Sequence, residues 1–301
     1  MIVPWLKGIL GWNVSPLAWT LVALNVFVFV MTLEPAPWNK TRAFQNAESL
    51  YLTGHLYYQY RGGEGLPERD KLALLGASAL RDIKFMNQAE KMEFKGDAIA
   101  IEKWKTDLVS FRETLSGRLT KIFGLSFDDE RPLSMITYQF MHAGMIHLLS
   151  NMMMLIIFAV AVEAQLGGLL LIFVYLAGGV AGAYGFKILG QSTLAPMIGA
   201  SGSLSALIAF YAVFEKKKRV SFFYFLSPFK GYYGWIYLPT YLIFPLLFVS
   251  DLAAYFGTSV EIGSGVAYTA HLGGMIFGIV FGLIMRVWKH YGGINFVFSS
   301  K

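Results

Sequence analysis

Six long stretches without a charged side chain constrain this chain more than any other feature of its sequence. A helix needs roughly 20 apolar residues to cross the hydrocarbon core of a bilayer, and each stretch is long enough. The stretches free of Asp, Glu, Lys and Arg are Gly8–Leu33, Pro132–Val162, Ala164–Phe186, Ile188–Phe214, Gly231–Ser250 and Ile262–Met285. We therefore predict an all-α polytopic membrane protein whose transmembrane helices cover residues 16–33, 143–162, 168–187, 200–214, 235–253 and 266–286. The uncharged run Val220–Phe229 is too short to span, so we expect it at the membrane interface.

The positions of the basic residues predict the orientation of these helices. With a cytoplasmic N-terminus, every basic residue outside the segment 34–131 except Lys187 falls on the cytoplasmic side, in agreement with the positive-inside rule. We therefore expect both termini in the cytoplasm, with a bacterial cell (inner) membrane as the working assignment. The basic run Lys216–Arg219 then anchors the topology, and no basic stripe remains that would predict a nucleic-acid partner.

The segment between the first two helices differs in composition from the rest of the chain. It holds 15 basic and 15 acidic residues, and apolar residues recur at helical spacing in Pro67–Glu93 and Asp97–Phe123. The predicted regions are an N-terminus with the first helix, a helical extracytoplasmic insertion, a core with helices two to six, and a cytoplasmic tail, at residues 1–33, 34–131, 132–291 and 292–301. The chain has no cysteine, which excludes disulfides and a cysteine nucleophile.

Polar side chains inside the predicted spans gather at one depth. Helix two carries His142, His147 and Asn151, helix four begins near Ser201, and helix six carries His271. These three helices run in the same direction, so all five residues lie in the outer part of the membrane. Because polar groups in spanning helices are energetically expensive, they mark functional sites, and the combination predicts a single site.

The residue types of this site indicate nucleophilic catalysis. A serine hydroxyl becomes a nucleophile when a neighbouring base accepts its proton, and the imidazole of His271 titrates near neutral pH. His147 and Asn151 are four residues apart, so they project from one helix face and either can donate a hydrogen bond to an oxyanion. Helices two, four and six offer no carboxylate at this depth, since Glu163 lies at the cytoplasmic end and Asp251 on helix five. We therefore predict a Ser–His dyad and not a triad.

Small residues support this geometry. Gly274 and Gly278 share one face of helix six with His271, and Ser205 lies one turn below Ser201 on helix four. Small residues at such spacing let membrane helices approach closely. We predict that these two faces pack together and bring the serine and the histidine into reach.

Three motifs occur in order on helices two, four and six. They are His142-x4-His147-x3-Asn151, Gly199-x-Ser201-Gly202 and Ala270-His271-x2-Gly274-x3-Gly278. On these residues the chain resembles the rhomboid family of intramembrane serine proteases, over about residues 11–33 and 132–291. The resemblance implies a six-transmembrane-helix rhomboid-like bundle that hydrolyses single-span membrane proteins near the outer membrane surface, without a metal or cofactor.

The resemblance also assigns roles to individual residues. It implies that Ser201 is the nucleophile, that His271 is the general base, and that His147, Asn151 and the backbone amide of Ser201 form the oxyanion hole. It implies supporting roles for a second group of residues, namely His142, Gly199, Gly202, Ser205, Gly274 and Gly278. The expected partners are a single-span transmembrane substrate and membrane lipid, and the sequence carries no signal for the oligomeric state.

The chain departs from the family pattern at two places. Leu133 and Ser134 stand where many members carry Trp-Arg, so we expect a different brace for the loop between helices one and two, with the insertion as a candidate. Ser205 stands where many members carry an aromatic residue beneath the histidine ring, so its hydroxyl is a candidate for orienting His271 instead.

Two other functions remain open at this point. The first is a non-catalytic rhomboid-like protein that binds membrane helices, which would be expected to lack the serine or the histidine. The second is a transporter or proton channel that uses His147 and His271, which would place polar residues through the full depth of the membrane. The inner halves of helices two and six, at Met152–Ala161 and Ile276–Met285, are apolar instead.

Overall fold

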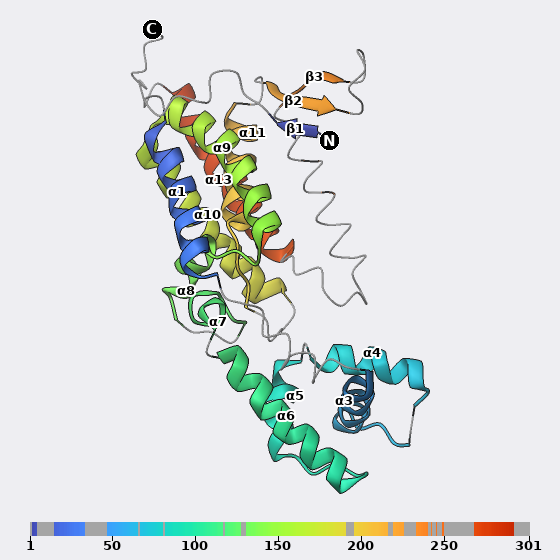
Figure 1. Ribbon diagram of the computed structural model, residues 1–301. Coiled ribbons are helices and arrows are strands. Elements are labelled where there is room, and N and C mark those ends of the chain that lie inside the picture. Colours follow the sequence, from blue (N-terminus) through green and yellow to red (C-terminus); the bar gives the residue numbers. More distant parts are fainter. Residues whose placement is uncertain are drawn as a thin grey trace.

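The computed structural model describes residues 2–4, 15–33, 47–65, 67–80, 82–116, 118–127, 131–190, 196–215, 219–225, 233–239 and 268–291, with single positions at 242, 245 and 249. In this part of the chain, five helices form an elongated bundle, and a second group of helices lies beyond one end of it (Figure 1). The bundle helices are α1 (Pro16–Met31), α9 (Met145–Leu166), α10 (Gly168–Leu189), α11 (Ser201–Phe214) and α13 (Tyr268–His290). Among the described residues, α9, α10 and α13 are long and apolar enough to cross a membrane, while α1 and α11 are apolar but shorter.

The ends of these helices follow local sequence signals. Pro16 begins α1, where the missing proline N–H would have no helical partner in any case. Gly167 separates α9 from α10 and has a φ of +85°, a left-handed conformation that side chains with a Cβ rarely adopt. The two helices are therefore joined by a turn at a single glycine.

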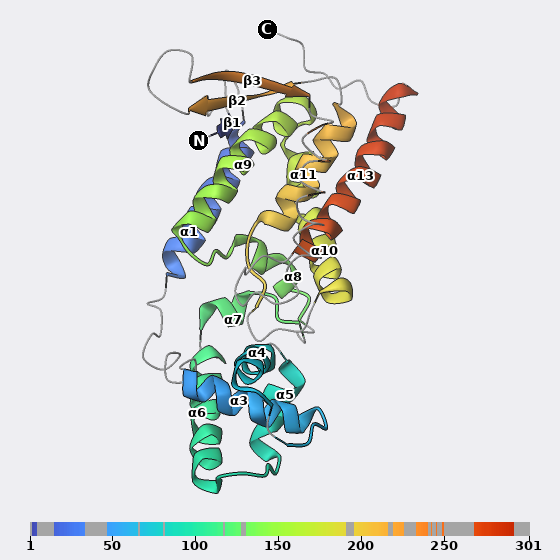
Figure 2. The ribbon, with the colours of Figure 1, turned by 90° about the vertical axis from the view of Figure 1, so that its right-hand side faces the viewer.

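The helix α11 occupies the centre of the bundle. Every residue from Gly202 to Ala212 is buried, and α9, α10 and α13 all contact it (Figure 2). A helix that is apolar on all sides is stable in a protein core or in lipid, and here other helices surround it. The core around it includes Leu155 of α9, Val174 of α10 and Phe210 of α11, each without exposed surface.

The approach of α13 to α11 is closest at the glycines of α13. A methyl group at Gly274 would collide with the carbonyl oxygen of Gly202, and one at Gly278 would collide with the carbonyl oxygen of Ala206. The predicted contact between helices four and six is therefore present, but the predicted face of α11 is wrong by one residue. Its contacts are Gly202 and Ala206, and not the stripe that begins at Ser201, because glycine and alanine allow the closest backbone approach.

The segment 34–131 contains a second group of helices with its own core. Its elements are α3 (Ala47–Tyr60), α4 (Arg69–Ala79), α5 (Ile83–Gln88), η1 (Ala89–Lys91), α6 (Ala98–Ser116) and α7 (Leu119–Phe123). Leu56, Phe85 and Leu108 are fully buried in this core, which is separate from the core of the bundle. We call this segment the insertion. Two short elements, α8 (Ser134–Thr137) and η2 (Tyr138–Phe140), then lead the chain back to α9.

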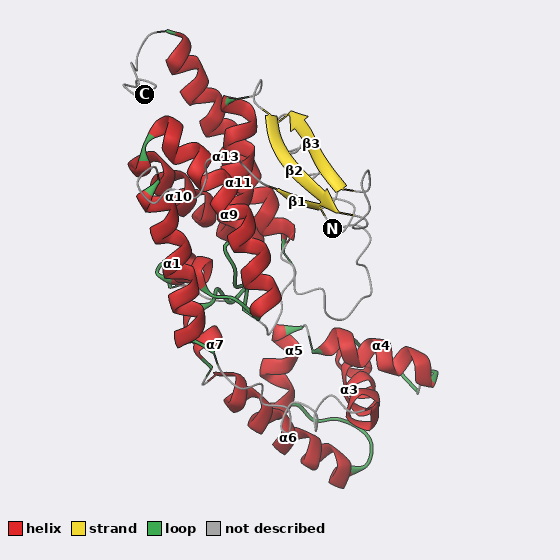
Figure 3. Ribbon diagram, turned by 45° about the horizontal axis from the view of Figure 1, so that its top comes forward, coloured by secondary structure: helices red, strands yellow, loops and turns green. Residues whose placement is uncertain are grey.

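A small antiparallel sheet, which we did not predict, lies at the opposite end of the bundle from the insertion (Figure 3). Val3 pairs with Phe223, and Phe222 pairs with Ile236. Its strands, in the order β1-β2-β3, are β1 (Ile2–Pro4), β2 (Arg219–Phe225) and β3 (Tyr233–Pro239).

This sheet corrects one prediction. β2 occupies part of the run Val220–Phe229, whose expected place at the membrane interface stays a prediction. β3 occupies residue 235, the predicted start of helix five, so that start is wrong. Beyond β3, predicted helix five lies outside the described residues except at positions 242, 245 and 249. The reason is that Phe, Tyr, Trp, Ile and Val are enriched in strands and also make a sequence window apolar enough to suggest a membrane helix.

Candidate active site

The first turns of α9, α11 and α13 lie at the end of the bundle nearest to α7 and α8 (Figure 2). Ser201 is the first residue of α11, and His271 lies in the first turn of α13. His147 and Asn151 lie in the first two turns of α9. The structure thus places the four residues at one end of the bundle, on the three helices that we inferred from the sequence.

His147 and Asn151 both face the glycine that precedes the serine. A methyl group at Gly199 would lie 2.9 Å from His147 Nε2 and 3.7 Å from Asn151 Nδ2. Gly199 also has a φ of +128°, a region that favours glycine. A side chain at position 199 would therefore be strained and would also displace the imidazole, so the glycine is what lets α9 approach Ser201.

His271 lies in the first turn of α13, the helix that packs against α11. The carbonyl oxygen of Ala270 lies 3.6 Å from where a methyl group at Gly202 would be. Gly202, which follows Ser201, and Ala270, which precedes His271, therefore lie close together where α11 packs against α13. Ser201 and His271 are each partly exposed, whereas Asn151 is buried.

The backbone N–H of Ser201 is a further donor at this site. Ser201 is the first helical residue of α11, and the first N–H groups of a helix have no partner within the helix. The preceding residue, Ala200, has no side-chain oxygen that could cap them. The helix dipole adds partial positive charge at the same place, which favours an anion near the Ser201 hydroxyl.

Tyr138 holds the loop before Ser201, and we did not single it out from the sequence. Its carbonyl oxygen accepts the Gly199 N–H at 2.9 Å, and its hydroxyl donates to the carbonyl oxygen of Gly179 at 2.7 Å. The side chain is only 1% exposed. The one sequence signal for Tyr138 is its place in the stretch Thr137-Tyr-Gln-Phe140, shortly before His142. Nothing in the neighbouring sequence shows that this tyrosine reaches α10.

Two of the predicted supporting residues, Ser205 and His142, are buried close to the site. The Ser205 hydroxyl donates to the carbonyl oxygen of Ser201 at 2.8 Å. Its oxygen can still accept a hydrogen bond, so its expected part in orienting His271 stays a prediction. Serine in a helix commonly bonds the carbonyl one turn back. His142 is buried behind His147, with the two rings edge to face and their centroids 5.2 Å apart.

The carboxylate of Glu163 serves a structural purpose at the opposite end of the bundle. It is buried, and its two oxygens accept the N–H groups of Leu17 at 3.1 Å and Ala18 at 2.7 Å. A carboxylate at a helix N-terminus satisfies unpaired donors and matches the helix dipole. Glu163 therefore joins α9 to α1 and does not orient His271, while Asp251 lies outside the described residues.

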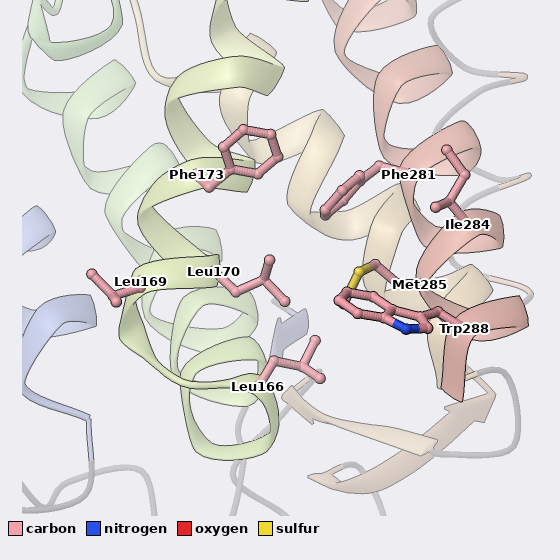
Figure 4. A pocket seen from close by; sticks show the side chains of 8 residues that line it. All are labelled: Leu166, Leu169, Leu170, Phe173, Phe281, Ile284, Met285 and Trp288. Carbon is pink, nitrogen blue, oxygen red and sulfur yellow. The ribbon is translucent and has the colours of Figure 1, made fainter. Parts of the chain in front are cut away.

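An apolar groove between α10 and α13 lies at the other end of the bundle from Ser201 (Figure 4). Its volume is about 560 Å³. The side chains that line it are Leu166, Leu169, Leu170, Phe173, Phe281, Ile284, Met285 and Trp288. It offers no nucleophile or base, and its lining is of the kind that faces lipid in a membrane protein.

Among the described residues, no three His, Asp or Glu side chains are grouped as metal ligands.

The fold and the site define an integral membrane protein built as a helical bundle around a central helix that begins with a serine. A family model described as the Rhomboid domain matches residues 129–288, a little more than half of the chain. The chain belongs to the rhomboid family. The match begins where the insertion ends, in agreement with the separate core of the insertion.

A curated relative is similar over the same part of the chain. RHOMBOID-like protein 4 of Arabidopsis thaliana is 25% identical over 161 residues, which cover 54% of this chain and 36% of the relative. The match thus spans about a third of the relative's length.

Proposed function

We propose that this protein is an intramembrane serine endopeptidase that hydrolyses peptide bonds of single-span membrane proteins. The observation that carries the proposal is the convergence of His147 and Asn151 on Gly199, two residues before Ser201. Three donors then face one point beside a serine, namely the two side chains and the Ser201 amide. A channel or a helix-binding protein has no need for donors arranged in this way.

The chemistry follows from the roles of these groups. Ser201 Oγ attacks the scissile carbonyl carbon while His271 accepts the hydroxyl proton. The oxyanion of the tetrahedral intermediate accepts hydrogen bonds from His147, Asn151 and the Ser201 N–H, and one such donor is typically worth about 2.7–4 kcal/mol. His271 then gives its proton to the leaving amine, and water attacks the acyl-enzyme by the same route in reverse.

The topology that we propose has six spans, with both termini in the cytoplasm and the insertion outside the membrane. The missing span lies between β3 and α13, in a region that is mostly outside the described residues. Two observations support this arrangement, since the insertion adjoins the serine end of the bundle and the sheet with the N-terminal strand lies at the other end (Figure 1). Cleavage would then take place near the outer surface of a membrane, for which a bacterial inner membrane is our assignment.

The experiment is cleavage of a model single-span substrate by purified protein in liposomes. Ser201→Ala and His271→Ala should each abolish cleavage, because a nucleophile and its base act as a unit. Ser78→Ala in the insertion and His290→Ala at the far end of α13 are matched controls, since both side chains are exposed and distant from the site. Wild-type turnover by Ser201→Ala would refute the proposal.

A further inference from the structure

We propose that the segment Arg118–Phe127, at the end of the insertion, is a brace that positions the catalytic serine, with Leu125 as its main positioning residue. This inference rests on the proposed protease function. It gives the insertion a part in catalysis, although no residue of the insertion touches the reacting atoms.

The brace is hydrogen-bonded to the loop that leads into α11. Leu125 and Met197 form an isolated antiparallel bridge, in which the Leu125 N–H donates to Met197 at 2.9 Å and the Met197 N–H donates to Leu125 at 2.8 Å. Gly199 follows two residues later and takes its own hydrogen bond from its N–H to Tyr138. The serine loop, residues 196–200, is thus held at both ends just before Ser201.

Side-chain packing adds to this backbone bridge. Leu125 has no exposed surface, and it lies in a small apolar cluster that also contains Tyr138, Met197 and Ala270. Ala270 precedes His271, and Tyr138 holds Gly199. The Leu125 side chain therefore belongs to the same apolar cluster as residues that adjoin the serine loop and His271.

The neighbouring Gly124 shows how closely the brace fits. A methyl group there would lie 2.8 Å from Ile198 Cγ2 and 3.0 Å from Pro196 Cβ, and it would collide with the carbonyl oxygen of Thr120. Its φ of −75° is open to any residue, so the requirement for glycine comes from the closeness of the Thr120 carbonyl on one side and of the serine loop on the other.

The other side of the brace is fixed to the start of the catalytic core. Thr137 donates its hydroxyl to the carbonyl oxygen of Phe123 at 2.6 Å, and the Arg131 guanidinium donates to the carbonyl oxygen of Ile122 at 2.9 Å. Leu133, in the place where many family members carry Trp-Arg, is itself 65% exposed. The brace therefore lies between the 131–137 segment and the serine loop. Because Leu133 and Ser134 replace Trp-Arg, we expected another support for the loop between helices one and two, and the brace is our candidate for it.

An engineered disulfide tests the brace directly, because the chain has no cysteine of its own. Hydrogen-bonded antiparallel partners have Cα atoms about 5.5 Å apart, which a disulfide can span. In the double variant Leu125→Cys, Met197→Cys, the reduced form should show a kcat at least about tenfold below wild type with a similar KM, since a misplacement of about 1 Å can cost roughly a hundredfold in rate. Oxidation should restore most of the rate.

Single variants separate positioning from general stability. Leu125→Ala should lower kcat about tenfold or more and Leu125→Met should retain it, whereas Leu108→Ala, the same truncation in the insertion's own core, should lower the melting temperature and leave kcat of the folded enzyme unchanged. If wild type cleaves and both Leu125→Ala and the reduced double variant match its kcat, the brace is refuted while the protease stands. If wild type itself does not cleave, the proposed function fails instead.

Discussion

A single methyl group at Gly278 should separate α13 from α11 and reduce activity, although it lies two turns away from His271. A Cβ at this position would lie 2.9 Å from the Phe210 backbone nitrogen and would collide with the carbonyl oxygen of Ala206. Ordinary contacts are about 3.5–4.0 Å, and the Ala206 carbonyl oxygen is nearer than the Phe210 nitrogen, so the helices would have to move apart by about 1 Å or more. Because the obstructing atoms are backbone, no rotamer change can relieve the collision.

The expected size of the effect follows from this displacement. Overpacking typically costs about 1–3 kcal/mol, and lipid supplies no hydrophobic force that would press the helices together again. A shift of about 1 Å at the site can lower the rate roughly a hundredfold. We therefore predict that Gly278→Ala lowers both the melting temperature and the turnover of a model substrate, and that Gly278→Leu is worse in both.

The matched control is Gly282→Ala, one turn further along the same face. A methyl there would lie 3.1 Å from the Phe210 carbonyl oxygen and 3.2 Å from Val213 Cβ, so a small adjustment should suffice and the effect should be mild. Both variants are measured by thermal unfolding in detergent and by turnover in liposomes. Wild-type stability and turnover in Gly278→Ala would refute the close contact on which the position of His271 depends.

Three further predictions concern other parts of the molecule. Asn151→Ala and His147→Ala should each slow cleavage by about ten- to a thousandfold, since one oxyanion donor is worth a few kcal/mol, and an unchanged rate in the double variant would remove α9 from the mechanism. Glu163→Ala should lower stability by about 1.5–3 kcal/mol, the usual size for hydrogen bonds to a charged group, which thermal unfolding would show; an unchanged melting temperature would mean that the cap of α1 contributes nothing. Replacement of residues 47–116 by a flexible linker should leave cleavage measurable in liposomes, whereas a deletion that also removes 118–127 should abolish it, and equal activity in the two deletions would contradict the brace.

Local sequence patterns predict most of the bundle helices of this fold. Uncharged runs of membrane-spanning length located α1, α9, α10, α11 and α13 to within a few residues, because a span must be apolar along its whole length. The same criterion failed at β3, where aromatic and β-branched residues form a strand. Apolar content reports burial or membrane contact, and it does not by itself distinguish a strand from a helix.

The candidate catalytic residues could be predicted from the sequence for a similar reason, whereas the residues that position them could not. Ser201, His147, Asn151 and His271 stand out because polar groups are rare in spanning helices. Leu125 looks like any apolar residue in a charged segment, and its role depends on a bridge to a residue far along the chain.

Packing distances also lie beyond what periodicity can show. Helical spacing predicted that Gly278 faces helix four, but it gives no distance between the two backbones. The backbone of Ala206 and Phe210 leaves no room even for alanine. The one-residue error in the face of α11 has the same origin, since a 3.6-residue repeat leaves neighbouring stripes of small residues that only the three-dimensional contact can separate.

The proposed mechanism is tested most directly by labelling of the purified protein with a serine-reactive fluorophosphonate. We predict a covalent adduct on Ser201 in the wild-type protein, located by mass spectrometry of the digested chain. Labelling should be lost in Ser201→Ala and greatly slowed in His271→Ala, while Ser78→Ala should label like wild type. A folded wild-type protein that does not react, or undiminished labelling of Ser201→Ala, would contradict the claim that Ser201 is an activated nucleophile.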